Sequence, residues 1–377
     1  MEKHLHIISL TIPFPVDYGG VFDLFYKIVA LHKEGIQIHL HCFEYGGRPQ
    51  QEELNKYCAS VHYYPRKSFL SNLFSGIPVM VSSRNNTLLT ETLLKDNYPI
   101  IMDGLQCTYL LQDKRLERRK KVVRLYNVEH EYYQDLASNT SATFKRFYLK
   151  REARLLYKYE KMVAQSGNTI LAVTEKDVAT YQKEYGAKNI QYIPIFLPNN
   201  WTVNSKAGRG NYCLYQGDLS VSSNEKAAIW LIEEVFAGTR NKLIIAGKSP
   251  SLNLYKSAGK RLNVLIIANP EEEQMQDFIQ VAHINILPSY SNTGIKLKLL
   301  NALYNGRFCL VNNLTTQGSG VESLCHYFED AESCKQKIAE LLTTEYTIQE
   351  IEKRKTVLSE AFNNQQDAKA LVAAIFD

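Results

Sequence analysis

At 377 residues the chain is longer than one hydrophobic core usually supports, so two domains are expected. Apolar residues make up 45% and charged residues 22%, which is typical of a globular protein. The net charge of +5 is too small to indicate nucleic-acid binding, and we exclude that function. The charge suits an anionic substrate or a weak attraction to an anionic membrane.

The seven cysteines are scattered and form no C-x-x-C pair, which favours a reducing compartment over a disulfide framework. The first residues, MEKHLHIISLTIPFPV, lack the features of a signal peptide, and no run of roughly 18 apolar residues is present. We therefore expect a cytoplasmic protein, with a peripheral contact at the inner face of the membrane as an option.

Short apolar runs alternate with longer helical segments, a pattern typical of parallel α/β layers. In the first half the predicted strands are Leu5–Leu10, Ile36–Phe43, Val61–Tyr64, Pro99–Leu105, Lys121–Tyr126, Thr169–Thr174 and Asn189–Leu197. The polar stretch Pro198–Asn211 follows, and its composition indicates an interdomain linker.

A second α/β series begins after this linker. Its predicted strands are Tyr212–Leu219, Lys242–Gly247, Val264–Asn269, Ile284–Ser289 and Phe308–Asn313, and its clearest helices are Asn224–Phe236, Glu271–Ala282 and Gly294–Asn305. After about Ala331 the pattern is helical only. We expect two doubly wound, Rossmann-like domains over 1–198 and 199–361 that face each other across a cleft, followed by a helix over 362–377. Ligands should bind in loops after strands.

The first such loop carries Gly19 and Gly20 just before a predicted helix. Paired glycines at a helix N-terminus let a phosphate approach bare N–H groups where the helix dipole is positive. A tight strand-to-helix turn is the simpler interpretation of this pair. The loop is not a G-x-G-x-x-G motif, and this disfavours a dehydrogenase.

The second loop, VVRLYNVEHEYYQDL, places Asn127 and Glu129 just past a strand. Polar and titratable side chains in such a position are candidates for acid–base or hydroxyl-binding roles. An ordinary polar loop is the alternative.

The third loop begins at the end of a strand, turns at Gly294 and starts a helix that carries Lys296 and Lys298. Free amides at a helix N-terminus and two lysines suit a diphosphate. A solvated lysine pair is the alternative, but Leu297, Leu299, Leu300 and Leu303 predict a largely buried helix.

Three further segments have structural interpretations. His39 and His41 lie on one face of a strand and are better explained as core or edge histidines than as metal ligands. The apolar stretch Ser68–Val81 suits a membrane contact or a buried helix equally. The basic stretch 143–165 predicts a domain-packing helix rather than a membrane-surface helix. Its helical stripe is Phe144, Tyr148, Leu155, Tyr159 and Val163, and Glu152 falls on this stripe.

Nearly the whole chain resembles the GT-B glycosyltransferases of family four, of the bacterial surface-polysaccharide type. The resemblance lies in P-x-P-x-x-x-G-G, R-x-Y-N-x-E-x-x-Y-Y, AVTEKD and YIPIF in the first half, and in YQGDLSVSSNEKAAIWLIEEVF, KLIIAG and TGIKLKLLNALYNGRFCLV in the second. It implies retaining, metal-independent transfer of a hexosyl group from a nucleotide-diphosphate sugar, without a cofactor. It also implies a terminal helix that crosses back to the N-terminal domain.

The resemblance also implies roles for single residues. Gly19 and Gly20 would face the donor phosphate or the acceptor. Gly217 and the adjacent Asp218 would lie close to the diphosphate, and Asn269 and Pro270 beside the base. The diphosphate would be held by the segment Thr293, Gly294, Ile295, Lys296, Lys298 and Asn301.

Two departures from the family pattern stand out. Thr293 and Asn301 occupy positions where the family commonly has glutamates, and Tyr126 stands where a histidine is common. The leading hypothesis is transfer of a sugar to a glycan or lipid-linked acceptor in surface polysaccharide synthesis. A catalytically degenerate GT-B protein that binds a nucleotide sugar or glycan is the second hypothesis, and sugar-nucleotide epimerisation is the third.

Overall fold

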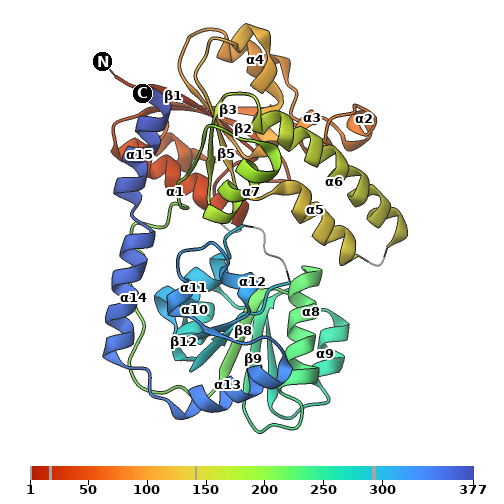
Figure 1. The fold of residues 1–377 in the computed structure, drawn as a ribbon, viewed down its shortest axis with the longest axis vertical. Coiled ribbons are helices and arrows are strands. Elements are labelled where there is room, and N and C mark those ends of the chain that lie inside the picture. Colours follow the sequence, from red (N-terminus) through yellow and green to blue (C-terminus); the bar gives the residue numbers. More distant parts are fainter. Residues whose placement is uncertain (1, 17–18, 141, 291–293) are drawn as a thin grey trace. The chain divides into compact units, whose positions relative to one another are not determined.

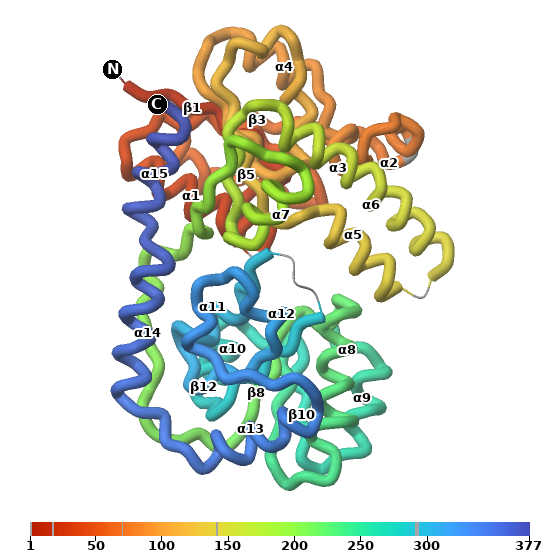
Figure 2. Tube along the Cα trace, viewed as in Figure 1, coloured from red at the N-terminus to blue at the C-terminus, as the bar shows by residue number. Residues whose placement is uncertain are grey.

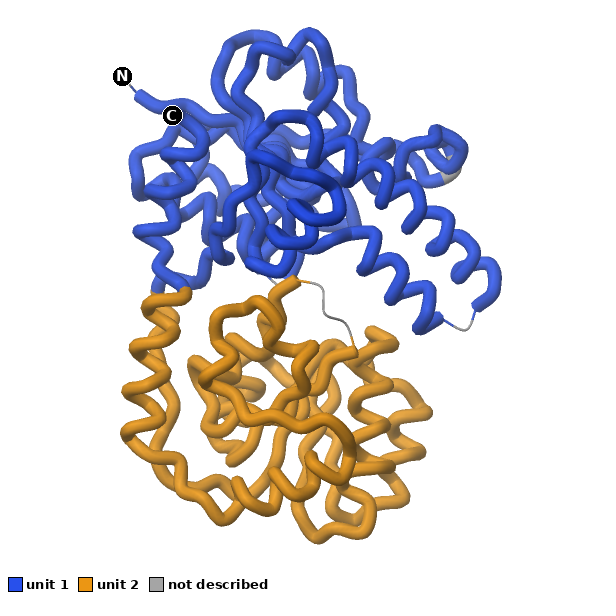
Figure 3. Tube along the Cα trace, in the orientation of Figure 1, with its two compact units in different colours: residues 1–199, 362–377 blue, residues 200–361 orange. Residues whose placement is uncertain are grey.

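The protein was analysed as a computed structural model that describes residues 2–16, 19–140, 142–290 and 294–377. The chain divides into two compact units, shown in different colours in Figure 3. Unit 1 comprises Met1–Asn199 together with Phe362–Asp377, and unit 2 comprises Asn200–Ala361.

The described part of unit 1 is built on a seven-stranded sheet in which every pair of neighbouring strands is parallel (Figure 1). Its strands, in spatial order, are β3 (Ser60–Pro65), β2 (Gln37–Glu44), β1 (His4–Ser9), β4 (Ile100–Asp103), β5 (Lys121–Leu125), β6 (Thr169–Ala172) and β7 (Ile190–Tyr192). Its helices are α1 (Gly19–Lys33), α2 (Phe69–Asn72), α3 (Val79–Ser82), α4 (Thr87–Leu93), α5 (Glu129–Ser138), α6 (Thr143–Ala164), α7 (Glu175–Tyr185) and α15 (Asn364–Phe376), with 3-10 turns at Glu52–Lys56, Leu105–Gln112 and Lys114–Leu116.

Two apolar cores cover the two faces of this sheet, because side chains alternate along each strand. Leu5 and Ile7 of β1 belong to the core that contains α1 and α15, whereas Ile8 belongs to the core beneath α3, α4, α6 and α7. Helix α15 contributes Ala368, Leu371 and Ile375 to the first core. The N- and C-terminal ends lie side by side (Figure 2), with the Lys3 ammonium 5.0 Å from the centre of the Phe376 ring.

The described part of unit 2 contains a six-stranded parallel sheet. Its strands, in spatial order, are β10 (Val264–Ala268), β9 (Leu243–Lys248), β8 (Cys213–Asp218), β11 (Ile284–Ile286), β12 (Phe308–Val311) and β13 (His326–Tyr327). Its helices are α8 (Ser222–Trp230), continued by a π-helical turn at Leu231–Val235, α9 (Leu252–Ala258), α10 (Glu272–Val281), α11 (Leu297–Asn305), α12 (Asn313–Thr316), α13 (Ala331–Thr343) and α14 (Ile348–Ala361), with a 3-10 turn at Glu322–Leu324.

Both sheets are doubly wound from a central strand, as the sequence predicts for Rossmann-like domains. The direction of winding reverses between β1 and β4 in unit 1 and between β8 and β11 in unit 2. In such sheets ligands bind at this reversal, outside the carboxyl ends of the strands. The loops after β8 and β11 are therefore the first place to look for a site in unit 2.

Some sequence predictions of elements were wrong. The strand predicted over Asn189–Leu197 ends at Tyr192. The Ile193 amide still donates to the Ala172 carbonyl of β6 at 3.1 Å, but the segment that follows bonds to side chains. Arg124 donates to the carbonyls of Ile193 and Pro194, and Asp23 accepts from the Phe196 amide. The short strand β13 was not predicted, since two residues carry no periodicity.

The stripe predicted for the basic helix was also wrong at its start. Phe144 is exposed, Leu155 is only partly buried, and the buried face of α6 instead contains Leu149, Ala153 and Leu156 with Glu152, Glu160 and Val163. The beginning of α6 therefore extends beyond the core that its second half contacts.

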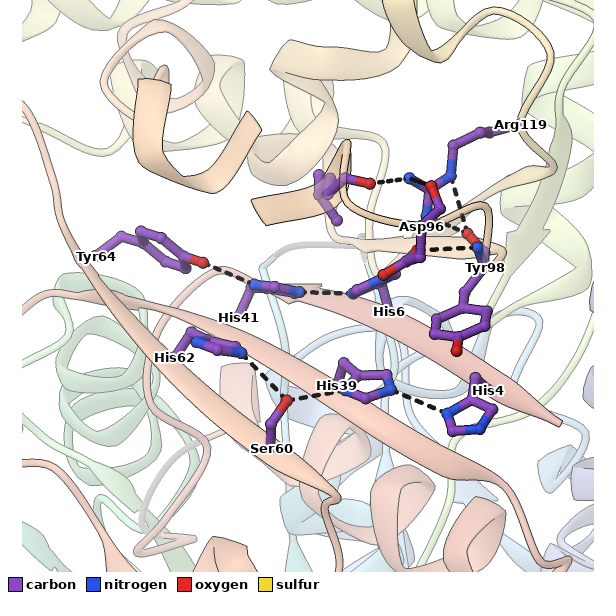
Figure 4. A network of polar contacts seen from close by, with 11 residues as sticks. His4, His6, His39, His41, Ser60, His62, Tyr64, Asp96, Tyr98 and Arg119 are labelled. Carbon is purple, nitrogen blue, oxygen red and sulfur yellow. Dashed lines mark hydrogen bonds and ion pairs between the residues drawn. The ribbon is translucent and has the colours of Figure 1, made fainter. Parts of the chain in front are cut away.

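His39 and His41 are part of a hydrogen-bonded histidine ladder across β1, β2 and β3 (Figure 4). The distance between ring nitrogens is 3.1 Å from His4 to His39 and 2.8 Å from His6 to His41. The ladder continues through Ser60, His62 and Tyr64 and is closed by Asp96, which contacts both His6 and Arg119. Both histidines lie on the interior strand β2, where His41 is buried and His39 partly buried, so their role in the described structure is structural, as predicted.

Among the described helices, none combines the length with the apolar character that a membrane span requires.

Candidate functional site

The last two residues of β8, Gly217 and Asp218, lie at the reversal point of the unit 2 sheet. A side chain at the neighbouring Gly247 would overlap the carbonyl oxygen of Gly217, so β8 and β9 can pack this closely only with glycine there. Asp218 accepts hydrogen bonds from the backbone amide and hydroxyl of Ser220, at 3.0 and 2.6 Å. Asp218 therefore shapes the turn into α8.

Asn269 and Pro270 follow β10 on the same edge of the sheet. Asn269 adopts a left-handed conformation, with φ of 49°, which asparagine tolerates better than most residues. Its side-chain oxygen accepts from the Ser249 amide at 2.8 Å, and its own amide donates to Gly247 at 2.8 Å. These bonds hold together the loops that follow β9 and β10.

The segment after β11 starts its helix later than the sequence predicts. Helix α11 begins at Leu297, whereas Lys296 is an extended N-cap residue and Ile295 precedes it outside the helix. Gly294 has a φ of 62°, which favours glycine and explains the turn at this position. Thr293 lies outside the described residues. The prediction that both lysines lie on the first helical turn is thus corrected, because the turn at Gly294 occupies additional residues.

Lys298 contacts two groups that carry no negative charge. Its ammonium lies 3.2 Å from the side-chain oxygen of Asn224 and 5.0 Å from the centre of the Tyr215 ring. Burial, and then the nearby charge of Lys296, lowers the pKa of Lys298 to about 8. An anion bound here would return the pKa toward its ordinary value, because it would supply the missing opposite charge.

Asn224 is the residue of this site that sequence reasoning missed. It lies at the start of α8 and donates to the Asp218 carbonyl at 2.9 Å while accepting from Lys298. A side chain at Gly217 would lie 3.4 Å from its amide nitrogen. Asn224 thus links the end of β8 to α11. A polar residue in the first turn of the helix after Gly-Asp was the available signal.

Asn301 lies one turn along α11 from Lys298 and is partly buried. Its side-chain oxygen accepts a hydrogen bond from the amide of Asn305 at 2.8 Å. The structure thus brings Gly217, Asp218 and Lys298 together, while Asn301 bonds within its own helix.

In unit 1, Gly19 and Gly20 form the first turn of α1, the helix that follows β1. Gly19 is exposed and Gly20 is partly exposed. Neither glycine has a positive φ, so their role is not to permit a special turn. One and two turns further on, α1 buries Asp23 and Lys27.

A buried ionic cluster occupies the region beneath this turn. The Lys27 ammonium contacts Asp103 and lies 3.1 Å from Asp23, and Arg124 lies 3.0 Å from the other oxygen of Asp23. The Tyr126 hydroxyl lies within hydrogen-bond distance of both carboxylates and accepts from the Lys27 ammonium. Burial by itself would raise the pKa of Asp23, but Arg124 and Lys27 together hold it well below its usual range. Tyr126 therefore belongs to a network of buried charged groups.

Asn127 and Glu129 follow β5, and Asn127 comes directly after Tyr126 of this cluster in the sequence. Glu129 is buried and accepts hydrogen bonds from Asn127 and, at 3.2 Å, from Gln106. Burial, together with the nearby Glu160 carboxylate, raises the pKa of Glu129 to about 8. Glu160 itself accepts from the backbone amides of Glu129 and His130 and so caps α5. Glu129 can therefore exchange a proton near neutral pH.

Comparisons with known proteins bear on the fold. No family model matches the sequence. An uncharacterized 44.6 kDa protein in the cps region of Klebsiella pneumoniae is 25% identical over 336 residues, which cover 83% of this chain and 84% of that protein. Sucrose-phosphate synthase from Thermosynechococcus elongatus aligns with a TM-score of 0.72 at 12% identity, over 99% of this chain and 98% of that one.

A variant of S. aureus TarM in complex with fondaparinux, α-GlcNAc-glycerol and UDP aligns with a TM-score of 0.63 at 10% identity, over 100% of both chains. Together with the order of the strands in both sheets, these alignments establish a GT-B fold of two Rossmann-like domains.

Proposed function

We propose that this protein is a glycosyltransferase that binds a nucleotide-diphosphate sugar in unit 2. The observation that carries the proposal is Lys298, whose described partners are uncharged and whose pKa is lowered to about 8 by burial and Lys296. The loops after β8 and β11 meet at the reversal point of the sheet, where doubly wound domains bind ligands. The TarM structure was determined with UDP, which is a ligand of this chemical class.

In this proposal the sugar passes with retention of configuration, and without a metal ion, to a glycan or lipid-linked acceptor in surface polysaccharide synthesis. Negative charge develops on the diphosphate as its bond to the sugar breaks, and Lys298 with Lys296 would stabilise that charge. The acceptor hydroxyl loses its proton as the new bond forms. We assign a role in handling this proton to Glu129, positioned by Asn127, because its pKa of about 8 suits proton exchange.

A second candidate function is a non-catalytic protein that binds a nucleotide sugar or glycan. It is favoured by Tyr126, whose hydroxyl bonds to Asp103 and Asp23, and by Asn301, whose side chain bonds to Asn305. Both positions are functional in the family that the sequence resembles. Transfer or hydrolysis of a donor by purified protein would exclude this alternative.

The donor site is tested by titrating nucleoside diphosphates and their sugars into the protein and into a Lys298→Ala variant, with calorimetry as the readout. Loss of one charge-assisted hydrogen bond should weaken diphosphate binding roughly 10- to 100-fold. Lys242→Ala is the matched control, because Lys242 immediately precedes β9, at the opposite end of the strands, and is exposed. Equal affinities in all three proteins would show that the diphosphate does not bind at Lys298.

A further inference from the structure

Four phenylalanine side chains of unit 1 are exposed on α6 and on the segment that contains α2. The exposed fraction is 93% for Phe144, 74% for Phe147, 89% for Phe74 and 47% for Phe69. Single exposed apolar residues are ordinary, but several that gather on one surface mark an interaction site.

Contacts within unit 1 join these two segments into one surface. The rings of Phe69 and Tyr148 pack edge to face with centres 5.2 Å apart. One turn further along α6, Arg151 donates to the Leu73 carbonyl, next to Phe74 in the chain. Figure 1 likewise shows α2 and α3 beside α6. The four phenylalanines thus belong to neighbouring parts of one surface.

Helix α6 surrounds these rings with positive charge. Its two acidic residues, Glu152 and Glu160, are buried and accept hydrogen bonds from the Val79 amide and from the start of α5. Every other charged residue of the helix is basic, and most are exposed: Lys145, Arg146, Lys150, Arg151, Arg154, Lys158 and Lys161. The outward face of the helix therefore carries no negative charge.

Spacing places much of this charge on one side of α6. Phe147, Lys150, Arg154, Lys158 and Lys161 recur three or four residues apart and are all exposed, which puts them on one helix face. Leu149, Ala153, Leu156 and Val163, on the opposite face, are buried. We call the exposed side, together with Phe69, Phe74 and Phe144, the α6 docking face.

We propose that the α6 docking face binds the surface of an anionic lipid bilayer. An interfacial helix of this kind inserts aromatic rings at the boundary between headgroups and acyl chains, while lysine and arginine contact anionic headgroups. Each lysine or arginine near such a surface is attracted to the anionic headgroups, and salt screens this attraction. The face supplies both features, and the proposal does not depend on glycosyl transfer.

Charge disfavours a second copy of the chain as the occupant. A symmetric dimer formed through this face would place the lysines and arginines of α6 against the same residues of the other copy. Such like-charge contacts oppose association. A bilayer that contains anionic lipid supplies the opposite charge and also accepts the exposed rings.

The test is co-sedimentation of the full chain with phosphatidylcholine vesicles that contain either no phosphatidylglycerol or roughly one-third of it. We expect binding to the anionic vesicles only, and loss of that binding at high salt. The triple variant Lys150→Gln, Arg154→Gln, Lys158→Gln should bind roughly 100-fold more weakly. The double variant Phe144→Ser, Phe147→Ser should also bind more weakly, because it removes the inserted rings.

Matched controls lie in unit 2. Lys335→Gln, Lys337→Gln, Lys355→Gln removes the same charge from α13 and α14, where these lysines are partly or fully exposed and paired with glutamates. Leu252→Ser, Leu262→Ser removes side chains that are 79% and 110% exposed. Both controls should bind vesicles like the unmodified protein. Circular dichroism and nucleotide titration report folding and the separate donor site for every variant.

Three outcomes would overturn the proposal. The first is absence of vesicle binding, and the second is equal binding to neutral vesicles. The third is an equal loss in the control and docking-face variants. Sedimentation velocity without vesicles identifies self-association as the alternative, if a dimer forms that Phe144→Ser, Phe147→Ser abolishes.

Discussion

Lys27 of α1 and Lys298 of α11 occupy similar places in the two units but have opposite surroundings. Each lysine lies on a helix that follows a strand next to the reversal point of its sheet, Lys298 in the first turn of its helix and Lys27 in the middle. Lys27 contacts the carboxylates of Asp23 and Asp103 and is fully buried. Lys298 contacts an amide oxygen and an aromatic ring.

The difference in their partners distinguishes Lys27, whose charge has a structural role, from Lys298, whose charge suits an anionic ligand. Removing one partner from a buried ion pair is strongly destabilising, because the other charge stays buried without compensation. A buried cation without a counter-charge is itself unfavourable, and a bound anion relieves that cost. The comparison therefore predicts that the two lysines respond in opposite ways to substitution.

The largest effect is expected for Lys27→Met. In the described part of the chain, the substitution leaves the buried Asp103 carboxylate with the Tyr126 hydroxyl as its close side-chain partner, so the free energy of unfolding should fall by about 3–5 kcal/mol. Urea unfolding followed by circular dichroism measures the change. Lys33→Met is the matched control, since Lys33 is exposed in the last turn of the same helix and should change stability little. Similar losses in both variants would contradict a structural role for the cluster.

Acid should destabilise unit 1 through the histidine ladder. Burial lowers the pKa of His6 to about 4, although Asp96 opposes this shift. The unfolded chain therefore binds a proton that the folded chain does not, and stability falls by about 1.4 kcal/mol per pH unit from pH 6.5 down to about 4. The sum for His6 alone is roughly 3 kcal/mol at pH 4.

Tryptophan fluorescence separates the two units in this experiment, because Trp201 and Trp230, the only tryptophans of the chain, lie in unit 2. On acidification the circular dichroism signal should fall before tryptophan fluorescence changes. His6→Gln should flatten the pH dependence, whereas the exposed control His32→Gln should leave it unchanged. Simultaneous changes of both signals would argue against a weakness confined to unit 1.

The surroundings of Glu129 resemble those of Lys298 more than those of Lys27, because the described partners of Glu129 include no opposite charge. Its pKa is about 8 in the folded protein, so the folded state holds a proton that the unfolded state releases above about 4.5, and stability falls as pH rises from 4.5 to 8. Glu129→Gln removes this titration. It should raise the melting temperature by a few degrees at pH 8, corresponding to about 1–2 kcal/mol, and by less at pH 5.

Differential scanning calorimetry at the two pH values measures this gain, and turnover measures its functional cost. Glu131→Gln is the control, because Glu131 is partly exposed and paired with Lys176 at 3.3 Å. A gain that does not depend on pH would mean that the Glu129 carboxyl does not titrate in this range.

The smallest effect on stability is expected for Lys298→Met. Because the pKa of Lys298 is lowered to about 8, the folded state binds a proton less readily than the unfolded state, and the charged lysine is a cost at pH 7. Stability should stay unchanged or rise by up to about 1 kcal/mol, and any gain should shrink between pH 8 and 10.5. A loss similar to that of Lys27→Met would show that Lys298 is a structural charge too.

The strands other than β13 were predictable because each contains a short apolar run between polar turns, and this pattern is local. Val122 and Val123 of β5 and Ile245 of β9, for example, are buried where the sequence places strands. The start of α11 was misplaced because the positive φ of Gly294 adds a turn that hydropathy does not reveal. The exposure of Phe144 was missed because periodicity identifies a face of α6 but not how far the underlying core extends.

The sequence by itself determined two doubly wound domains and the segments around Gly217 and Lys298, since strand, turn and helix patterns depend on neighbours in the chain. Only the tertiary structure decided which charges are paired. Lys27 meets Asp103, and Arg124 meets Asp23, across 76 and 101 positions of the chain. Lys298, by contrast, meets Asn224 and an aromatic ring instead of a carboxylate. These partners are fixed by the packing that brings distant strands together, and local sequence patterns do not reveal that packing.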